Sequence, residues 1–256
     1  MKILVCIKAV PNDFLHLRLN AGATGYDEDG IAFRVNEYDL CAMEEAARIK
    51  ERLGGEITVV SLGPPRIIEQ IKKAMALGAD HGLLLDDPVH QDQDALSIAS
   101  RIAAWAQDKN FDLILCGVMS EDMQRSQTGP MLAQILGLPC ATTVIAERIS
   151  DDCATITCER ELEGGQRERA QLPLPALITV QSGINVPRYA SLSNVLRVKQ
   201  YQVPTIASAA LAPGARSEII QRAYFPARAT RCEFLTGSAE RIAEKLAEKI
   251  RAGNYE

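Results

Sequence analysis

The polar loop between Gly117 and Pro130 is the part of the chain best suited to chemistry. It contains one cation and three neutral donors in a row: Arg125, Ser126, Gln127 and Thr128. A helix is predicted directly after the loop, at 131–136. Backbone N–H groups and hydroxyls at the start of a helix can bind an anion such as a phosphate group. The loop therefore favours a nucleotide site, although Ser126 or Thr128 could instead do no more than cap the helix.

Catalysis by cysteine or by a bound metal finds no support in the residue spacing. The seven cysteines stand at positions 6, 41, 116, 140, 153, 158 and 232. They form no CxxC pair, and no nearby histidine completes a metal site or a nucleophile–base pair. We interpret them as buried free thiols, and we assign no catalytic residue and no metal ligand.

Known phosphate-binding motifs are also missing. The chain has no GxxxxGK[ST], no GxGxxG after the first predicted strand and no Ser-Gly-Gly loop, so a nucleotide would be held rather than cleaved. Acidic residues at 86, 87, 92 and 94 could suggest a metal. They flank a turn before a helix, where acids favour the helix dipole and solvent, and we interpret them as capping residues.

The elements that must position the loop follow a repeating pattern in the first half of the chain. Apolar runs predict strands at 2–8, 56–62, 81–86 and 112–116, and helical periodicity predicts helices at 38–53, 66–77 and 94–107. This alternation is typical of a doubly wound parallel sheet. Ligands of such sheets bind outside the carboxyl ends of the strands, which selects the loops at 6–13, 61–65 and 117–128.

The second half of the chain has a different sequence pattern. Strands are predicted at 142–147, 154–160, 166–172 and 176–180, with a hairpin turn at Gly164-Gly165, and they should extend the same sheet. Residues 201–234 have no sustained periodicity, so they are either disordered or an arm laid along a partner. Ser238 is expected to cap a final helix with an apolar stripe. We predict a mostly parallel α/β domain at 1–200 and a C-terminal arm and helix at 201–256.

The composition of the chain excludes some classes of binding partner. The formal net charge is -5 and the pI is near 5.4, which argues against binding to nucleic acid or to anionic membranes. No apolar stretch approaches the roughly 20 residues of a membrane span, and the first residues do not resemble a signal peptide. We expect a cytoplasmic protein whose partner is a protein or a small molecule.

Six segments in order resemble the beta subunit of electron-transfer flavoproteins. They are the opening 3–8 (ILVCIK), 35–39 (VNEYD) with 43–46 (MEEA), 74–80 (AMALGAD), the loop 117–130, 159–165 (ERELEGG) and 187–192 (PRYASL). No single segment is decisive, but together they cover nearly the whole chain. The resemblance implies an adenine-nucleotide alpha-hydrolase-like fold and a heterodimer whose alpha subunit holds the redox FAD.

The resemblance also assigns functional residues. The beta-subunit nucleotide site, which holds AMP in most family members, would be formed by Cys6, Lys8, Asn36, Glu37, Tyr38, Asp39, Leu62, Gly117, Val118, Met119, Ser120, Asp122, Met123, Gln124, Arg125, Ser126, Gln127 and Thr128. Flavin dehydrogenases, acyl-CoA dehydrogenase-like or other, would dock on Pro187, Arg188, Tyr189, Leu192 and Arg197. Leu192 would be the apolar anchor, unless it is a core residue of a short helix. The arm at 201–234 would embrace the alpha subunit.

The chain departs from the family pattern inside the nucleotide loop. Compared with AMP-binding members, the loop lacks one acidic group and gains Arg125, which could help to accommodate the extra phosphate of a second FAD, as in electron-bifurcating members. Those members usually have DGDTAQ at this place, and this chain does not. AMP and FAD both remain open, and so does a stand-alone adenine-nucleotide-binding regulatory protein of similar fold.

Overall fold

The computed structural model describes residues 1–14, 16–211, 216–226 and 232–252. The chain forms two compact units, Met1–Ala223 and Tyr224–Glu256, which are described separately here. No helix in these described ranges is long and apolar enough to cross a membrane.

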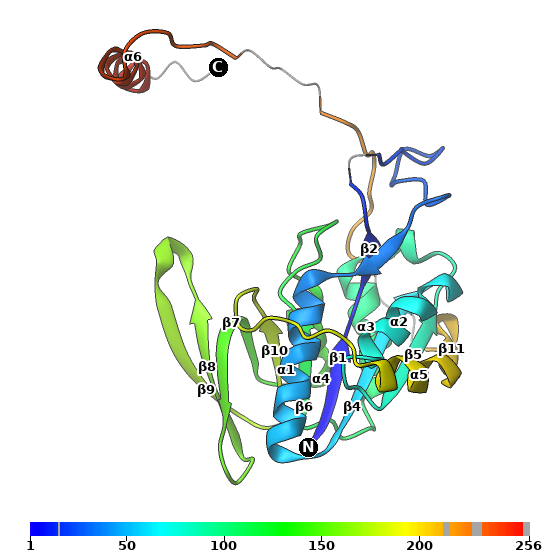
Figure 1. Cartoon of the computed structure of the whole chain (residues 1–256). Helices are drawn as coiled ribbons and strands as arrows, with labels where there is room; N and C mark the ends of the chain where they lie inside the picture. Colours follow the sequence, from blue (N-terminus) through cyan, green and yellow to red (C-terminus); the bar gives the residue numbers. More distant parts are fainter. Residues whose placement is uncertain (15, 212–215, 227–231, 253–256) are drawn as a thin grey trace. The chain divides into compact units, whose positions relative to one another are not determined.

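A nine-stranded sheet forms the centre of the first unit, in the order β11-β5-β4-β1-β6-β10-β7-β8-β9 (Figure 1). Its strands are β1 (Lys2–Cys6), β4 (Glu56–Gly63), β5 (His81–Asp86), β6 (Leu113–Gly117), β7 (Cys140–Ile149), β8 (Thr155–Glu161), β9 (Arg167–Pro173), β10 (Ala176–Val180) and β11 (Thr205–Ala207). All neighbours from β11 to β7 are parallel, whereas β7, β8 and β9 pair antiparallel. The predicted mostly parallel sheet is therefore confirmed.

Helices cover both faces of this sheet. They are α1 (Glu37–Leu53), α2 (Ile68–Met75), α3 (Ala95–Ala106), α4 (Thr128–Leu136) and α5 (Leu192–Gln200), with short 3-10 turns η1 (Pro65–Ile67), η2 (His90–Asp92), η3 (Glu163–Gly165) and η4 (Ser208–Ala210). Ile3 and Val5 of β1 pack with α1 and α2 in one core, while Leu4 packs with α3 and α4 in the other. Because successive residues of a strand face opposite sides, one apolar run fills both cores, as doubly wound sheets require.

The later strands extend the sheet as predicted, and Gly164 and Gly165 form the turn between β8 and β9. β10 does not simply follow β9, however, but enters the sheet between β6 and β7. The sequence pattern also missed a two-stranded antiparallel sheet, made by β2 (Ala9–Pro11) and β3 (Phe33–Val35). Three-residue strands are too short to carry a readable period.

The predicted arm requires a correction at its beginning. Residues Thr205–Ala207 form β11, which pairs in parallel with β5 at the sheet edge, and the first compact unit continues to Ala223 rather than ending at 200. Edge strands this short are specified by pairing with a neighbour and not by local pattern. Parts of the predicted arm, 212–215 and 227–231, lie outside the described residues.

The second unit contains α6 (Ala239–Arg251). The side chain of Ser238 accepts a hydrogen bond from the Arg241 N–H, which confirms the predicted cap. No residue of the helix is buried, and Leu246 and Ile250 are each 50% exposed. The unit as described therefore leaves an apolar stripe uncovered.

Candidate functional site

The order of the strands places the candidate site at the ends of β1 and β6. From β1 the chain proceeds to β4 and β5 on one side of the sheet, and then returns to β6 on the other side. The carboxyl ends of β1 and β6 are therefore adjacent at a topological switch point, where open α/β sheets bind their ligands. The predicted loops after β1 and β6 begin here.

Asp39, in the first turn of α1, joins the two strand ends. Its carboxylate accepts hydrogen bonds from the backbone N–H of Lys8 at 2.7 Å and of Gly117 at 3.0 Å. Burial raises the pKa of Asp39 to about 7, although the hydrogen bonds from Lys8, Asn36 and Gly117 act in the opposite direction. A side chain on Gly117 would not fit, because its Cβ would lie 2.3 Å from Asp39 Oδ1 and 2.7 Å from Tyr38 Cβ.

Asn36 holds the first part of the loop at 117–130. It is 1% exposed, and its amide donates to the Met119 carbonyl at 2.9 Å and accepts from the Glu121 N–H at 3.1 Å. Its own N–H donates to the Lys8 carbonyl at 3.0 Å. Asn36 precedes α1 but makes no side-chain cap, since both ends of its amide serve the loop.

Two ion pairs fix the acidic residues of the loop. Lys8 Nζ contacts both carboxylate oxygens of Asp122, at 2.7 and 2.6 Å, and lies 3.4 Å from Ser120 Oγ. Arg34 pairs with Glu121 at 2.7 Å, and the other oxygen of Glu121 accepts the Glu37 N–H at 3.2 Å. The sequence analysis missed Arg34 and Glu121, because only the fold brings them together.

The second part of the loop leads into α4 with an unusual backbone. Gln124 and Ser126 have positive φ angles of 52° and 54°, which cost non-glycine residues on the order of 1 kcal/mol each and often mark functional sites. No side chain caps α4, whose preceding residue is Gln127, so the alternative in which Ser126 or Thr128 caps the helix is wrong. The buried amide oxygen of Gln127 has no hydrogen-bond partner. The uncapped N–H groups at the start of α4 suit an anion that accepts hydrogen bonds, whereas the Gln127 oxygen needs a donor.

Arg125 is paired within the chain. Its guanidinium contacts the carboxylate of Glu218, and the amide nitrogen of Gln127 lies 3.5 Å from the same carboxylate. Glu218 comes from the segment at 216–226, which the sequence analysis assigned to the arm. The cation predicted to face a phosphate is thus already accompanied by an acid.

Asp94 anchors that segment. One of its oxygens caps α3 by accepting the Ser97 N–H at 2.8 Å, which confirms the capping interpretation for Asp94. The other accepts the Ser217 hydroxyl at 2.7 Å and the Glu218 N–H at 2.9 Å. Although burial opposes them, the hydrogen bonds from Ser97 and Ser217 lower the pKa of Asp94 to about 2. Asp87, to which the same interpretation applied, is instead buried and lies 3.3 Å from Arg101.

The remaining predicted site residues lie below or beside the loop. Cys6 and Cys116 are buried cross-strand neighbours, and a hydrogen bond between the two thiols, together with burial, raises the pKa of the Cys116 thiol. Val118 is buried, Leu62 packs against the core under the loop, and Met123 is 41% exposed. Cys6, Cys41, Cys116 and Cys158 are buried free thiols as predicted, whereas Cys140 and Cys153 are half-buried and Cys232 is exposed.

The predicted docking segment has an exposed apolar surface held from beneath. Tyr189 is 99% exposed and Leu192 is 75% exposed. Leu192 begins α5, so the helix of the alternative interpretation exists, but the side chain is not in the core. Arg188 binds Glu44 at 2.7 Å and also contacts Glu51, while Arg197 donates to the Ala79 carbonyl at 2.9 Å. Pro187 precedes this anchor and is half-buried.

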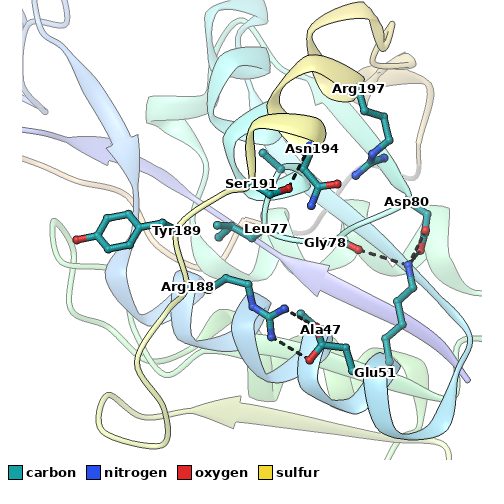
Figure 2. Close-up of a pocket in the computed structure, with 12 residues that line it drawn as sticks. Ala47, Glu51, Leu77, Gly78, Asp80, Arg188, Tyr189, Ser191, Asn194 and Arg197 are labelled. Carbon is teal, nitrogen blue, oxygen red and sulfur yellow. Dashed lines mark hydrogen bonds and ion pairs between the residues drawn. The ribbon is translucent and has the colours of Figure 1, made fainter.

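A pocket of about 510 Å³ lies beneath this segment, beside the second half of α1 and the end of α2 (Figure 2). Three cations border it, and each has a partner: Lys50 binds Asp80 at 2.6 Å, and Arg188 and Arg197 make the contacts described above. This pocket is distinct from the switch point, which lies at the first turn of α1.

Comparisons with known proteins agree on one family. A family model described as the electron transfer flavoprotein domain matches residues 24–211. Proteins named electron transfer flavoprotein subunit beta are similar along most of the chain. That of Methylophilus methylotrophus is 31% identical over 98% of both chains, and that of Syntrophomonas wolfei is 33% identical over 97% of this chain and 95% of the relative. The human protein is 34% identical over 80% of this chain and 81% of its own.

Proposed function

Because the chain belongs to the electron transfer flavoprotein family and is related to its beta subunits, we propose that it is the beta half of a heterodimer that carries electrons on flavin. In this role it makes and breaks no bond of a substrate. It holds a nucleotide at the switch point and binds two proteins, an alpha subunit and a flavin dehydrogenase.

The start of α4 is the observation that carries the nucleotide part of this proposal. It has no side-chain cap, and two residues before it are held at positive φ. These features suit a phosphate group bound by the backbone at 124–128. The ends of β1, β4 and β6, with Cys6, Leu62 and Tyr38, would then form the floor of the adenosine site.

The bound nucleotide would be AMP or a second FAD, since both contain the adenylate group that this site suits. FAD supplies redox chemistry when bound, and AMP supplies none. A second FAD would make an electron-bifurcating member of the family the leading interpretation. In either case the shared redox FAD would be held mainly by the alpha subunit.

Protein docking would use two separate surfaces. The exposed pair Tyr189 and Leu192 suits the apolar centre of a small transient interface with a flavin dehydrogenase. The segment after 211 and the apolar stripe of α6 suit a larger, permanent interface with the alpha subunit. A stand-alone adenine-nucleotide-binding regulatory protein would need neither surface.

The experiment that tests the proposal is co-expression of this chain with an electron transfer flavoprotein alpha subunit of the same organism. The complex is purified, denatured, and assayed for released FAD and AMP by chromatography. One FAD and one AMP per heterodimer would support a simple electron carrier, and two FAD without AMP would support a bifurcating one. A stable monomer that binds ATP and no alpha subunit would favour the regulatory protein and contradict the proposal.

A further inference from the structure

The carboxylate of Glu218 lies beside Arg125, the cation that could help to accommodate the extra phosphate of a second FAD. It contacts Arg125, the one cation at 123–128, and it lies within 3.5 Å of the Gln127 amide nitrogen at the start of α4. We infer that Glu218 is a specificity-determining residue that limits the number of phosphate groups accepted beside Arg125. The inference rests on the proposed nucleotide site and deepens it.

Glu218 is held in this position by its own backbone. The Glu218 N–H and the Ser217 hydroxyl both donate to one oxygen of Asp94, at 2.9 and 2.7 Å. The other oxygen of Asp94 caps α3, so the anchor belongs to the rigid part of the fold. The backbone that carries Glu218 is therefore anchored beside the loop.

The other charges of the loop are already paired, so the Glu218 carboxylate determines whether a second phosphate group meets a free cation. Asp122 is neutralised by Lys8, Glu121 by Arg34, and Arg125 by Glu218. One phosphate group can still be stabilised by the backbone and the dipole at the start of α4. A second phosphate group meets no unpaired cation among these side chains and is repelled by Glu218.

The contact with Glu218 changes the effect that we expect Arg125 to have on nucleotide binding. The sequence suggests that this cation favours the additional phosphate of a dinucleotide. Paired with Glu218, it instead gives no net charge, which favours a monophosphate such as AMP over a diphosphate such as ADP or the pyrophosphate of FAD. Specificity is expected to follow from the pair and not from Arg125 alone.

The test compares affinities for AMP and ADP, which differ by one phosphate group. Isothermal titration calorimetry is performed on the full chain and on its Glu218→Gln variant, at low and at high salt. Glutamine retains the size and the hydrogen-bond acceptor but removes the charge. We expect the affinity for ADP relative to AMP to rise by about threefold to tenfold, and less at high salt, because both side chains are partly exposed.

Two further variants make the result specific. Glu168→Gln removes an acid that pairs with Arg160 on the β8–β9 hairpin, and it should leave the ADP-to-AMP ratio unchanged. Arg125→Gln leaves Glu218 unpaired and should shift the ratio toward AMP.

The possible results separate the inference from the proposed function. An unchanged ratio in Glu218→Gln, or equal changes for both nucleotides, would overturn the inference while leaving AMP binding intact. If the unmodified chain bound neither nucleotide, the proposed nucleotide site itself would be contradicted, and the inference with it.

Discussion

One carboxylate and one glycine define the junction at the switch point. Asp39 receives the N–H groups of Lys8 and Gly117, so it ties the end of β1 to the end of β6 and to the first turn of α1. Gly117 allows this approach because it has no Cβ. The geometry of the loop at 117–130 depends on both residues.

A methyl group at position 117 should disturb this junction. In Gly117→Ala the new Cβ would lie 2.3 Å from Asp39 Oδ1 and 2.9 Å from the Asp39 backbone nitrogen, so α1 would have to shift. We expect the free energy of unfolding to fall by about 1–3 kcal/mol, together with loss of bound nucleotide. Urea denaturation and nucleotide analysis measure both. Gly22→Ala is the control, since its Cβ would meet only an ordinary contact at 3.5 Å.

The buried carboxyl of Asp39 should make stability depend on pH. Its pKa is raised from 3.8 to about 7, so the folded chain holds this proton more tightly than the unfolded chain. The favourable contribution is complete below the ordinary value and is lost as the pH rises toward about 7. In the native chain this decline in the free energy of unfolding should amount to a few kcal/mol at most. Asp39→Asn cannot titrate at this position and should not show the decline.

Urea denaturation between pH 4 and pH 8 would compare the two proteins, with Asp29→Asn as an exposed control. At pH 4, Asp39→Asn should be less stable than the native chain, since an amide nitrogen would face one of the two N–H donors. If the free energies of unfolding of the native and Asp39→Asn chains changed in parallel with pH, the pKa of Asp39 would not be raised and the prediction would be wrong.

At the level of secondary structure, α1 organises both surfaces of the proposed function. Its first turn closes the switch point, and its later turns carry Glu44 and Glu51, which hold Arg188. These two acids lie seven residues apart and therefore on one face of the helix. Hydrogen bonds from Arg188 and Arg48 lower the pKa of Glu44 even though burial opposes this, so the pair stays charged.

Loss of the Arg188 side chain should make the docking segment at 186–192 more mobile without unfolding α1. In Arg188→Met, the backbone at 186–192 loses its anchor, and we expect faster amide hydrogen exchange there and a destabilisation of about 1–3 kcal/mol. With a dehydrogenase partner, KM for the flavoprotein should rise while kcat changes little.

Arg48→Met provides a matched control, because Arg48 also binds Glu44 but does not contact the segment. It should leave exchange at 186–192 and KM near the native values. If both variants behaved alike, general stability of α1 would explain the effect, and Arg188 would have no positioning role.

For the molecule as a whole, a complete double-layered core contrasts with a C-terminal unit that buries none of its helix. The described part of α6 presents Leu246 and Ile250 half exposed, which is typical of a surface that is completed by another protein. We therefore assign this unit to the proposed alpha-subunit interface.

An acid on the apolar stripe should weaken the heterodimer. Leu246→Asp is expected to reduce affinity for the alpha subunit on the order of tenfold or more, because one leucine is no longer buried and a charge is desolvated. Lys245→Asp places the same acid at the adjacent, charged position of the helix and should have a smaller effect. Co-purification and surface plasmon resonance measure this. Equal binding by native and Leu246→Asp chains would exclude α6 from the interface.

The sequence by itself determined the elements whose pattern is local. The main strands, α1 to α3, the hairpin turn at Gly164 and Gly165, and the caps by Asp94 and Ser238 follow from periodicity and residue type within a few positions. The switch-point loop could also be chosen, because ligands bind parallel sheets at the carboxyl ends of strands.

Only the tertiary structure decided which distant residues meet. The insertion of β10 between β6 and β7, the pairing of β11 with β5, and the contact of Arg125 with Glu218 across 93 residues depend on strand order. Periodicity indicates that a residue is buried, but it does not indicate which residues the side chain contacts. For that reason the loop could be found from its sequence, whereas the partner that neutralises its cation could not.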